Sequence, residues 1–200
     1  MTGDLESGTN SVSAAALVLA RWWSRPIAPQ LSHWAELAEV ATEMGRQLDA
    51  PVPDAILAVS LADASVLSAE YEHLFVGPGP VSCPPYESYW RKDVPVNVRG
   101  ALMGPCVPKL RELYARLGIA AAPEAVELPD HVAVEFEALA YALSQPGDDA
   151  RDTARTLVAE HLTVWLPSLC QAVAREAREP FYTELAALTP RWFEQIAQCV

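Results

Sequence analysis

The side chains that could support catalysis gather in one segment, between Glu70 and Trp90. Glu70 and His73 have the ExxH spacing that places a carboxylate and an imidazole on one face of a helix, as in di-iron bundles. Such a site needs a second ExxH pair and two further carboxylates, yet no other histidine lies three residues after a glutamate. This half-site therefore does not predict a metal centre.

Two nucleophilic side chains follow in the same segment, Ser82 and Cys83. Neither belongs to a glycine-flanked serine elbow or to an oxyanion arrangement. The Gly77-Pro-Gly sequence lacks the GK[ST] that completes a phosphate-binding loop. We therefore expect a protein without enzyme activity and without a cofactor.

The cysteines of the chain are scattered. No CxxC pair or Cys/His cluster occurs, so neither a zinc site nor a disulfide framework is predicted. This usage suits a reducing cytoplasm. The apolar run from Ala14 to Ala20 is too short to span a bilayer, so stable membrane insertion is not expected. The four cysteines are Cys83, Cys106, Cys170 and Cys199.

The chain is acidic, with a formal net charge of -12 and a pI near 4.7. Nucleic-acid binding needs clustered Lys and Arg, so that class is disfavoured, as is an anionic membrane surface. An acidic surface attracts a cationic partner, although ordinary solubility explains the charge equally well. A basic stretch from Arg91 to Arg116 lies between two acidic ones and could simply pair with them.

Helical periodicity and proline positions predict an all-α, single-domain bundle of roughly 8–11 helices over residues 11–200, after a disordered tail at residues 1–10. No stretch alternates like a strand. The first helix should begin at Ser11 or Ser13 and end at Trp23. The next helices are expected from Ser32 to Leu48 and from Asp54 to Gly77, followed by a loop from Gly77 to Pro95.

The second half should also be helical. A helix from Val98 to Leu117, broken near Gly104-Pro105 and Pro108, should end at a Gly118 cap. A linker over residues 120–128 should precede a helix opened by Pro129 and Asp130 and closed by Pro146-Gly147. The last helices are expected from Asp149 to Cys170, with a break at Pro167, and from Pro180 to Ile196.

Two segments carry most of the unusual residues. The first, EYEHLFVGPGPVSCPPYESYW, mixes Gly and Pro with aromatic side chains, a composition that suits the gripping of a peptide. A stiff connecting loop whose aromatic side chains pack on the bundle would have the same composition. In the second, Glu127 to Glu135, Asp130 could cap a helix, and His131 and Glu135 could form an i, i+4 pair without further function.

Together, the LFVGPG after EY, the downstream PPYES-Y and the PDH-x3-E segment resemble the TorD/DmsD/NarJ-type family of redox-enzyme maturation chaperones. The resemblance covers about residues 70–140 and leans to the TorD/DmsD side. It implies an all-α cytoplasmic chaperone that binds the twin-arginine signal peptide of a molybdopterin-containing oxidoreductase. The chaperone would delay export until the cofactor is loaded. It also implies a monomer that can exchange helices between chains.

In the family that the sequence resembles, the peptide-binding surface lies around these motifs, so the resemblance implies that residues of both motifs bind the peptide here. Glu72, Glu127 or Asp130 would accept a guanidinium group of the peptide, and which one does so stays open. Asp130→Ala and Phe75→Ala should then weaken binding without affecting the fold. The expected peptide-binding residues are Glu72, Leu74, Phe75, Gly77, Pro78, Pro85, Tyr86, Ser88, Trp90, Glu127, Pro129, Asp130 and His131.

The sequence departs from the family pattern at two positions, with Tyr86 where several relatives carry Trp and Glu87 where a small residue is common. Partner preference is therefore open. The alternative is a helical adaptor or assembly subunit, which would use the same surface for a folded partner rather than for a peptide.

Overall fold

The computed structural model describes residues 2–27, 34–59, 63–78, 81–119 and 127–200, with side chains from residue 11 onward apart from Ala35. In these ranges the chain forms ten α-helices and no strand, which confirms the predicted all-α class. A single isolated antiparallel bridge joins Tyr86 and His131. None of the described helices is long and apolar enough to cross a membrane.

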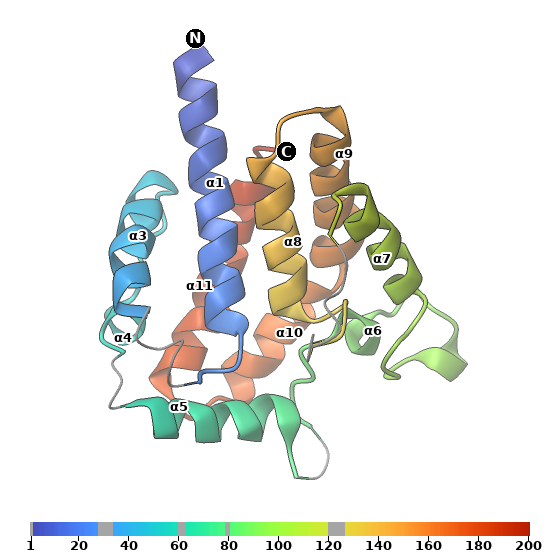
Figure 1. The fold of residues 1–200 in the computed structure, drawn as a ribbon. Coiled ribbons are helices and arrows are strands. Elements are labelled where there is room, and N and C mark those ends of the chain that lie inside the picture. The colour runs from blue at the N-terminus through green and yellow to red at the C-terminus, as the bar shows by residue number, and fades with distance from the viewer. Residues whose placement is uncertain (1, 28–33, 60–62, 79–80, 120–126) are drawn as a thin grey trace.

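The centre of the bundle is the contact between α1 (Thr2–Trp23) and α8 (Val132–Ser144), which lie side by side in Figure 1. Alanines at positions 15, 16, 133 and 140 are buried, and their small side chains let the two helices approach closely. Helix α1 begins at Thr2, before the predicted start at Ser11 or Ser13. The disorder of residues 1–10 stays a prediction.

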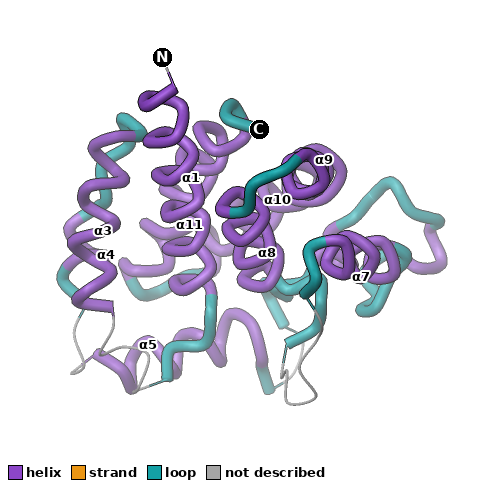
Figure 2. Tube along the Cα trace, turned by 45° about the horizontal axis from the view of Figure 1, so that its top comes forward, coloured by secondary structure: helices purple, strands orange, loops and turns teal. Residues whose placement is uncertain are grey.

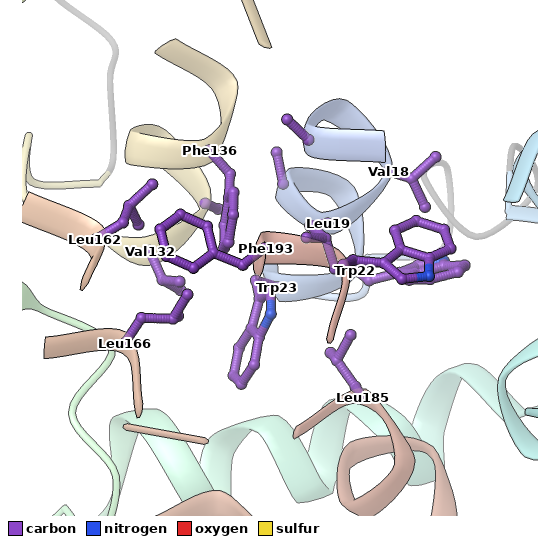
Figure 3. Close-up of a cluster of buried hydrophobic side chains, with 14 of the residues drawn as sticks. Val18, Leu19, Trp22, Trp23, Val132, Phe136, Leu162, Leu166, Leu185 and Phe193 are labelled. Atoms are coloured by element: carbon purple, nitrogen blue, oxygen red, sulfur yellow. The ribbon is translucent and has the colours of Figure 1, made fainter. Parts of the chain in front are cut away.

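Large aromatic side chains fill the space where α1 meets α8 and α11 (Pro180–Ala197), as Figure 3 shows for Trp23, Phe136 and Phe193. The indole N–H of Trp23 donates to Thr189 Oγ1 at 3.0 Å, so the polar atom of this buried ring is satisfied. Helix α11 starts with Pro180 in its first turn, as predicted, since proline lacks an N–H that the first turn would leave unpaired.

Helix α9 (Asp148–Thr156) continues through a π-helical segment, Leu157–Leu162, into α10 (Thr163–Glu176). The predicted break at Pro167 is wrong, because Pro167 lies inside α10. The ring of this proline faces the carbonyl of Thr163, four residues earlier, where the wider π-helical turns end. The irregularity of the helix therefore lies upstream of the proline.

Helices α3 (Trp34–Gln47) and α4 (Asp54–Leu57) cover one side of the bundle, and α5 (Ala64–Tyr71) runs across its base (Figures 1 and 2). The predicted start of α3 at Ser32 lies outside the described residues. The continuous helix predicted from Asp54 is wrong, because α4 and α5 are separate. A π-helical segment, Glu72–Val76, extends α5 to Gly77, whose φ of +92° ends it as predicted.

The segment after Gly77 contains a short helix, α6 (Glu87–Trp90), where the sequence predicted only loop. A 3-10 turn, Val96–Val98, and α7 (Cys106–Arg116) follow. The helix predicted from Val98 is wrong up to Pro105, since Gly100 and Met103 have φ values of +74° and +58° that a helix excludes. Gly118 has a φ of +72° directly after the helix, as predicted for its cap. Most of the predicted linker at 120–128 lies outside the described residues.

Candidate functional site

The two motifs of the sequence meet in space. The backbone N–H of Glu87 donates to the carbonyl of Asp130 at 2.9 Å, and that of Val132 donates to the carbonyl of Pro85 at 2.9 Å. These two bonds form the antiparallel bridge between Tyr86 and His131, whose rings lie 5.3 Å apart, edge to face. The PPYES and PDH segments therefore form one structural unit.

Asp130 is fully buried, and its carboxylate forms hydrogen bonds with α6 rather than with α8. Its Oδ2 accepts hydrogen bonds from the Ser88 hydroxyl and, at 3.1 Å, from the Ser88 backbone N–H. The prediction that Asp130 caps its own helix is wrong, because the following residue does so: Nδ1 of His131 accepts from the N–H of Ala133 at 3.1 Å. Burial raises the pKa of the Asp130 carboxyl group.

His131 is neutral in this setting, since burial lowers its pKa from 6.5 to about 3. With Nδ1 as the acceptor, Nε2 carries the hydrogen and faces the Tyr71 hydroxyl at 3.4 Å and Glu127 Oε2 at 3.7 Å. The predicted side-chain pair between His131 and Glu135 does not form. Instead, Glu135 Oε2 accepts from the indole N–H of Trp165 at 3.3 Å.

Behind the motifs lies a buried acidic group that the sequence reading missed. Glu87 contacts His161 Nδ1 at 2.9 Å and forms an ion pair with Arg91, whose guanidinium also binds Asp93. Burial, with the charge of Glu87 as a smaller cause, raises the pKa of Glu135 well above its ordinary value. The signal available in the sequence was Glu87 itself, which the resemblance had marked as a departure from the family pattern.

An apolar groove of about 540 Å³ opens at the surface beside the paired motifs. Two exposed aliphatic side chains stand at it, Val76 with 47% and Leu102 with 51% of their surface exposed. Aliphatic side chains exposed at an apolar groove make a surface suited to binding an apolar segment. The residues that line the groove are Phe75, Val76, Val81, Pro84, Tyr86, Tyr89, Gly100 and Leu102.

The predicted site residues divide into three groups by position. Phe75 and Tyr86 line the groove. The second group is buried beneath it and comprises Leu74, Pro85, Ser88, Asp130 and His131. The third group lies around it, partly or fully exposed, and comprises Glu72, Gly77, Pro78, Trp90, Glu127 and Pro129. Trp90 shapes the loop, since its indole N–H donates to the carbonyl of Pro84 at 2.6 Å.

Six groove residues were absent from the predicted set. Four of them, Val76, Val81, Pro84 and Tyr89, fall within the segment that its composition singled out. Gly100 and Leu102 belong to a stretch that was expected to be helical, and nothing local in the sequence places that stretch against Tyr89.

The structure gives no support to the other chemistry considered for the segment from Glu70 to Trp90. Glu70 is buried and its Oε1 accepts from the backbone N–H of Arg178 at 2.6 Å, which ties α5 to the turn before α11. Among the described residues, no group of three or more His, Cys, Asp or Glu side chains is placed to hold a metal ion. Burial raises the pKa of the Cys83 and Cys106 thiols to about 12, so neither is an activated nucleophile.

Comparisons with known proteins agree with this fold and these motifs. A family model for the nitrate reductase delta subunit matches residues 29–171, which include both motifs. The fold is similar to the crystal structure of an Archaeoglobus fulgidus protein described as a redox enzyme maturation protein. The TM-score is 0.63 at 21% sequence identity, over 91% of this chain and 93% of that one. At this identity the likeness concerns the fold alone.

The family model spans most of the chain, whereas the narrower likeness to the TorD/DmsD side stays a prediction. The chain therefore belongs to the nitrate reductase delta subunit family, the family of redox-enzyme maturation proteins that its motifs resemble.

Proposed function

We propose that this protein is a cytoplasmic chaperone for the maturation of a molybdopterin-containing oxidoreductase, and that it binds the twin-arginine signal peptide of that enzyme before export. Membership of the family supports the maturation role. The observation that carries the peptide-binding role is the apolar groove beside the paired motifs.

The groove has the chemistry that one part of such a peptide requires. A twin-arginine signal peptide presents two guanidinium groups next to an apolar stretch. Aromatic side chains such as Phe75, Tyr86 and Tyr89 offer a large contact area at low cost in conformational entropy. Val76 and Leu102 add aliphatic surface that is exposed to solvent until it is covered. The apolar stretch of the peptide would therefore lie in the groove.

Of the three carboxylates predicted to accept a guanidinium, Glu127 is best placed. Asp130 is buried, and Glu72 already forms an ion pair with Arg25. The Glu127 side chain is 34% exposed and accepts from the hydroxyl of Tyr86, a residue that lines the groove. Its histidine neighbour is neutral, so the charge of Glu127 is free to pair with an arginine.

The proposal is tested by calorimetric titration with synthetic signal peptides of oxidoreductases encoded in the same genome. Each peptide is paired with a version in which both arginines are alanine. Saturable binding of one peptide, weakened by loss of the arginine pair, is the expected result. No saturable binding of any of them would overturn the proposal.

A second observation favours the alternative, an adaptor for a folded partner. The basic stretch from Arg91 to Arg116 could have paired with the acidic ones, but among the described residues only its Arg91 forms ion pairs. Next to the groove, Val96 and Met103 are exposed. An acidic protein surface would complement the cations that form no ion pair with another described residue, which are Lys92, Arg99, Lys109, Arg111 and Arg116. Retention of an assembled oxidoreductase by the chain, without binding of its peptide, would support this alternative.

A further inference from the structure

We propose that Ser88 is a positioning residue: it holds one wall of the groove at the distance from the opposite wall that admits an apolar peptide segment. This inference rests on the proposed peptide-binding function and assigns a role to a buried side chain that the peptide does not touch. The wall in question is the arm, defined as residues 94–104, which runs as a loop outside the main bundle, next to α7 (Figure 2).

The two walls of the groove differ in how firmly they are held. Phe75 and Val76 belong to the π-helical extension of α5, and the Phe75 ring packs in the core against Trp23 and Tyr182. The loop after it is tied back by the N–H of Cys83, which donates to the carbonyl of Leu74 at 3.0 Å. This wall is part of the core and cannot move independently of it.

The arm supplies the opposite wall through Gly100 and Leu102, and it has little packing of its own. Val96 at its tip is 77% exposed, and most of its other residues are also exposed. Its backbone hydrogen bonds join residues three apart, such as Val98 N–H to the carbonyl of Pro95 at 3.0 Å. Such turns shape the arm but do not attach it to the bundle.

Two attachments fix the ends of the arm. Before it, Asp93 is held by the guanidinium of Arg91 through two hydrogen bonds of 2.9 and 2.7 Å. At its other end, the N–H of Gly104 donates to Ser88 Oγ at 2.8 Å. Among the hydrogen bonds of the described residues, this is the one that links the arm to α6, the helix that precedes it in the chain.

Ser88 is well suited to this attachment because its own position is fixed. Its hydroxyl donates to Asp130 Oδ2, so the oxygen lone pairs accept, one from the N–H of Gly104 and one from the Cys106 thiol, whose sulfur lies 3.2 Å away. Its backbone N–H donates to the same carboxylate oxygen. The contact is also close, since a Cβ added at Gly104 would lie 3.2 Å from both Cβ and Oγ of Ser88. A chain from Asp130 through Ser88 to Gly104 thus connects the PDH segment to the arm.

If Ser88 acts by placing the arm, its effect on affinity must pass through the arm side chain that the peptide contacts. Leu102 is that side chain, whereas Val76 stands on the opposite wall and is placed independently of Ser88. Residues that act through a common element show non-additive effects, and independent residues show additive ones. This difference separates positioning from general destabilisation.

The test is a pair of double-mutant cycles measured by calorimetric titration with the signal peptide. Ser88→Ala, Leu102→Ala and Val76→Ala should each weaken binding about tenfold, a step within the range of single interface truncations. The double variant S88A/L102A should bind about as weakly as L102A alone. The double variant S88A/V76A should bind about a hundredfold more weakly than the original chain, the product expected of independent sites.

Additivity in the first cycle, or unchanged affinity in Ser88→Ala, would overturn the positioning role. Helical circular dichroism and melting report whether Ser88→Ala is folded. If it is not, Gly104→Ala takes its place in both cycles, because it disturbs the same contact from the arm and leaves the bonds between Ser88 and Asp130 in place. Absence of peptide binding by the original chain would instead refute the proposed function, and this inference with it.

Discussion

Two neighbouring acidic side chains of the PDH segment have different environments. Asp130 lies beneath the surface with its Oδ2 engaged by Ser88, whereas Glu127 is partly exposed next to Tyr86. A buried carboxylate cannot reach an arginine of a bound peptide without being uncovered first. At the scale of single residues, Glu127 would therefore bind an arginine of the peptide, whereas Asp130 holds Ser88 in place.

Glu127→Gln should lower the affinity for a twin-arginine peptide about tenfold, since hydrogen bonds between charged groups contribute about 1.5–3 kcal/mol. The substitution keeps the size of the side chain and removes its charge. Glu36→Gln, at an exposed glutamate of α3, serves as the matched control and should bind like the original chain. Equal affinity of both variants would remove Glu127 from the site. The measurement is calorimetric titration.

His131 should make the stability of the fold dependent on acidity. Its folded pKa of about 3 lies below the ordinary value of 6.5, so the unfolded chain binds a proton that the folded chain does not. The free energy of unfolding should therefore fall as the pH is lowered from about 6.5 toward 3, by up to about 1.4 kcal/mol per pH unit for this group.

His131→Asn isolates that contribution, because asparagine can still cap α8 with its side-chain oxygen but does not titrate. Urea unfolding at several pH values between about 4 and 7 should show a shallower decline for the variant than for the original chain. Parallel declines would show that His131 is already accessible to protons in the folded state. Comparing slopes avoids any effect of the smaller side chain on absolute stability.

At the scale of elements, the pairing of Pro85–Glu87 with Asp130–Val132 holds α6 against the start of α8. Asp130→Ala should destabilise the fold by about 1–3 kcal/mol, because two buried donors of Ser88 lose their acceptor. Asp130→Asn keeps an oxygen at that place and should lose less. Urea unfolding measures both, and an Asp130→Ala variant as stable as the original chain would contradict this role.

This expectation replaces the one drawn from sequence, in which Asp130→Ala and Phe75→Ala left the fold unaffected. Both residues were assigned to the peptide-binding surface because of the resemblance. A resemblance in sequence indicates where a residue lies in a motif, but not whether its side chain is buried. Phe75 contacts Trp23, Tyr71 and Tyr182 in the core, so its truncation also removes packing. Binding and stability effects must therefore be measured separately for these two residues.

Helices bounded by strong local signals were predictable, and irregular segments were not. Pro180 at the start of α11, Gly118 after α7 and Gly77 after the π-helical segment each act through backbone constraints of one residue. The π-helical turns at 72–76 and 157–162 and the short α6 depend on packing between distant segments. Periodicity within a single segment does not contain that information.

The same distinction applies to the site. Composition singled out the segment from Glu70 to Trp90, which contains six of the eight residues that line the groove. The part of the arm from Val98 onward was assigned to a helix, and the placement of Gly100 beside Tyr89 at the groove depends on tertiary structure. The wall that carries Leu102 therefore needed the structure.

At the scale of the whole molecule, the arm lines the groove and lies with α7 on one side of the bundle. The protein as a whole carries a net charge of -12. The opposite side is covered by α3 and α4 (Figure 1). A cationic signal peptide would be drawn to the acidic protein at long range and held by the apolar groove at short range. The central claim is thus a claim about where on the molecule the peptide lies.

Photo-cross-linking tests this claim most directly. A signal peptide carrying a benzophenone amino acid in its apolar stretch is bound, irradiated and mapped by mass spectrometry. We expect adducts on groove residues, chiefly on Val76 and Leu102, the exposed large side chains of its lining, and their loss when unlabelled peptide competes. Competed adducts confined to α3 and α4, with none on the groove, would contradict the account.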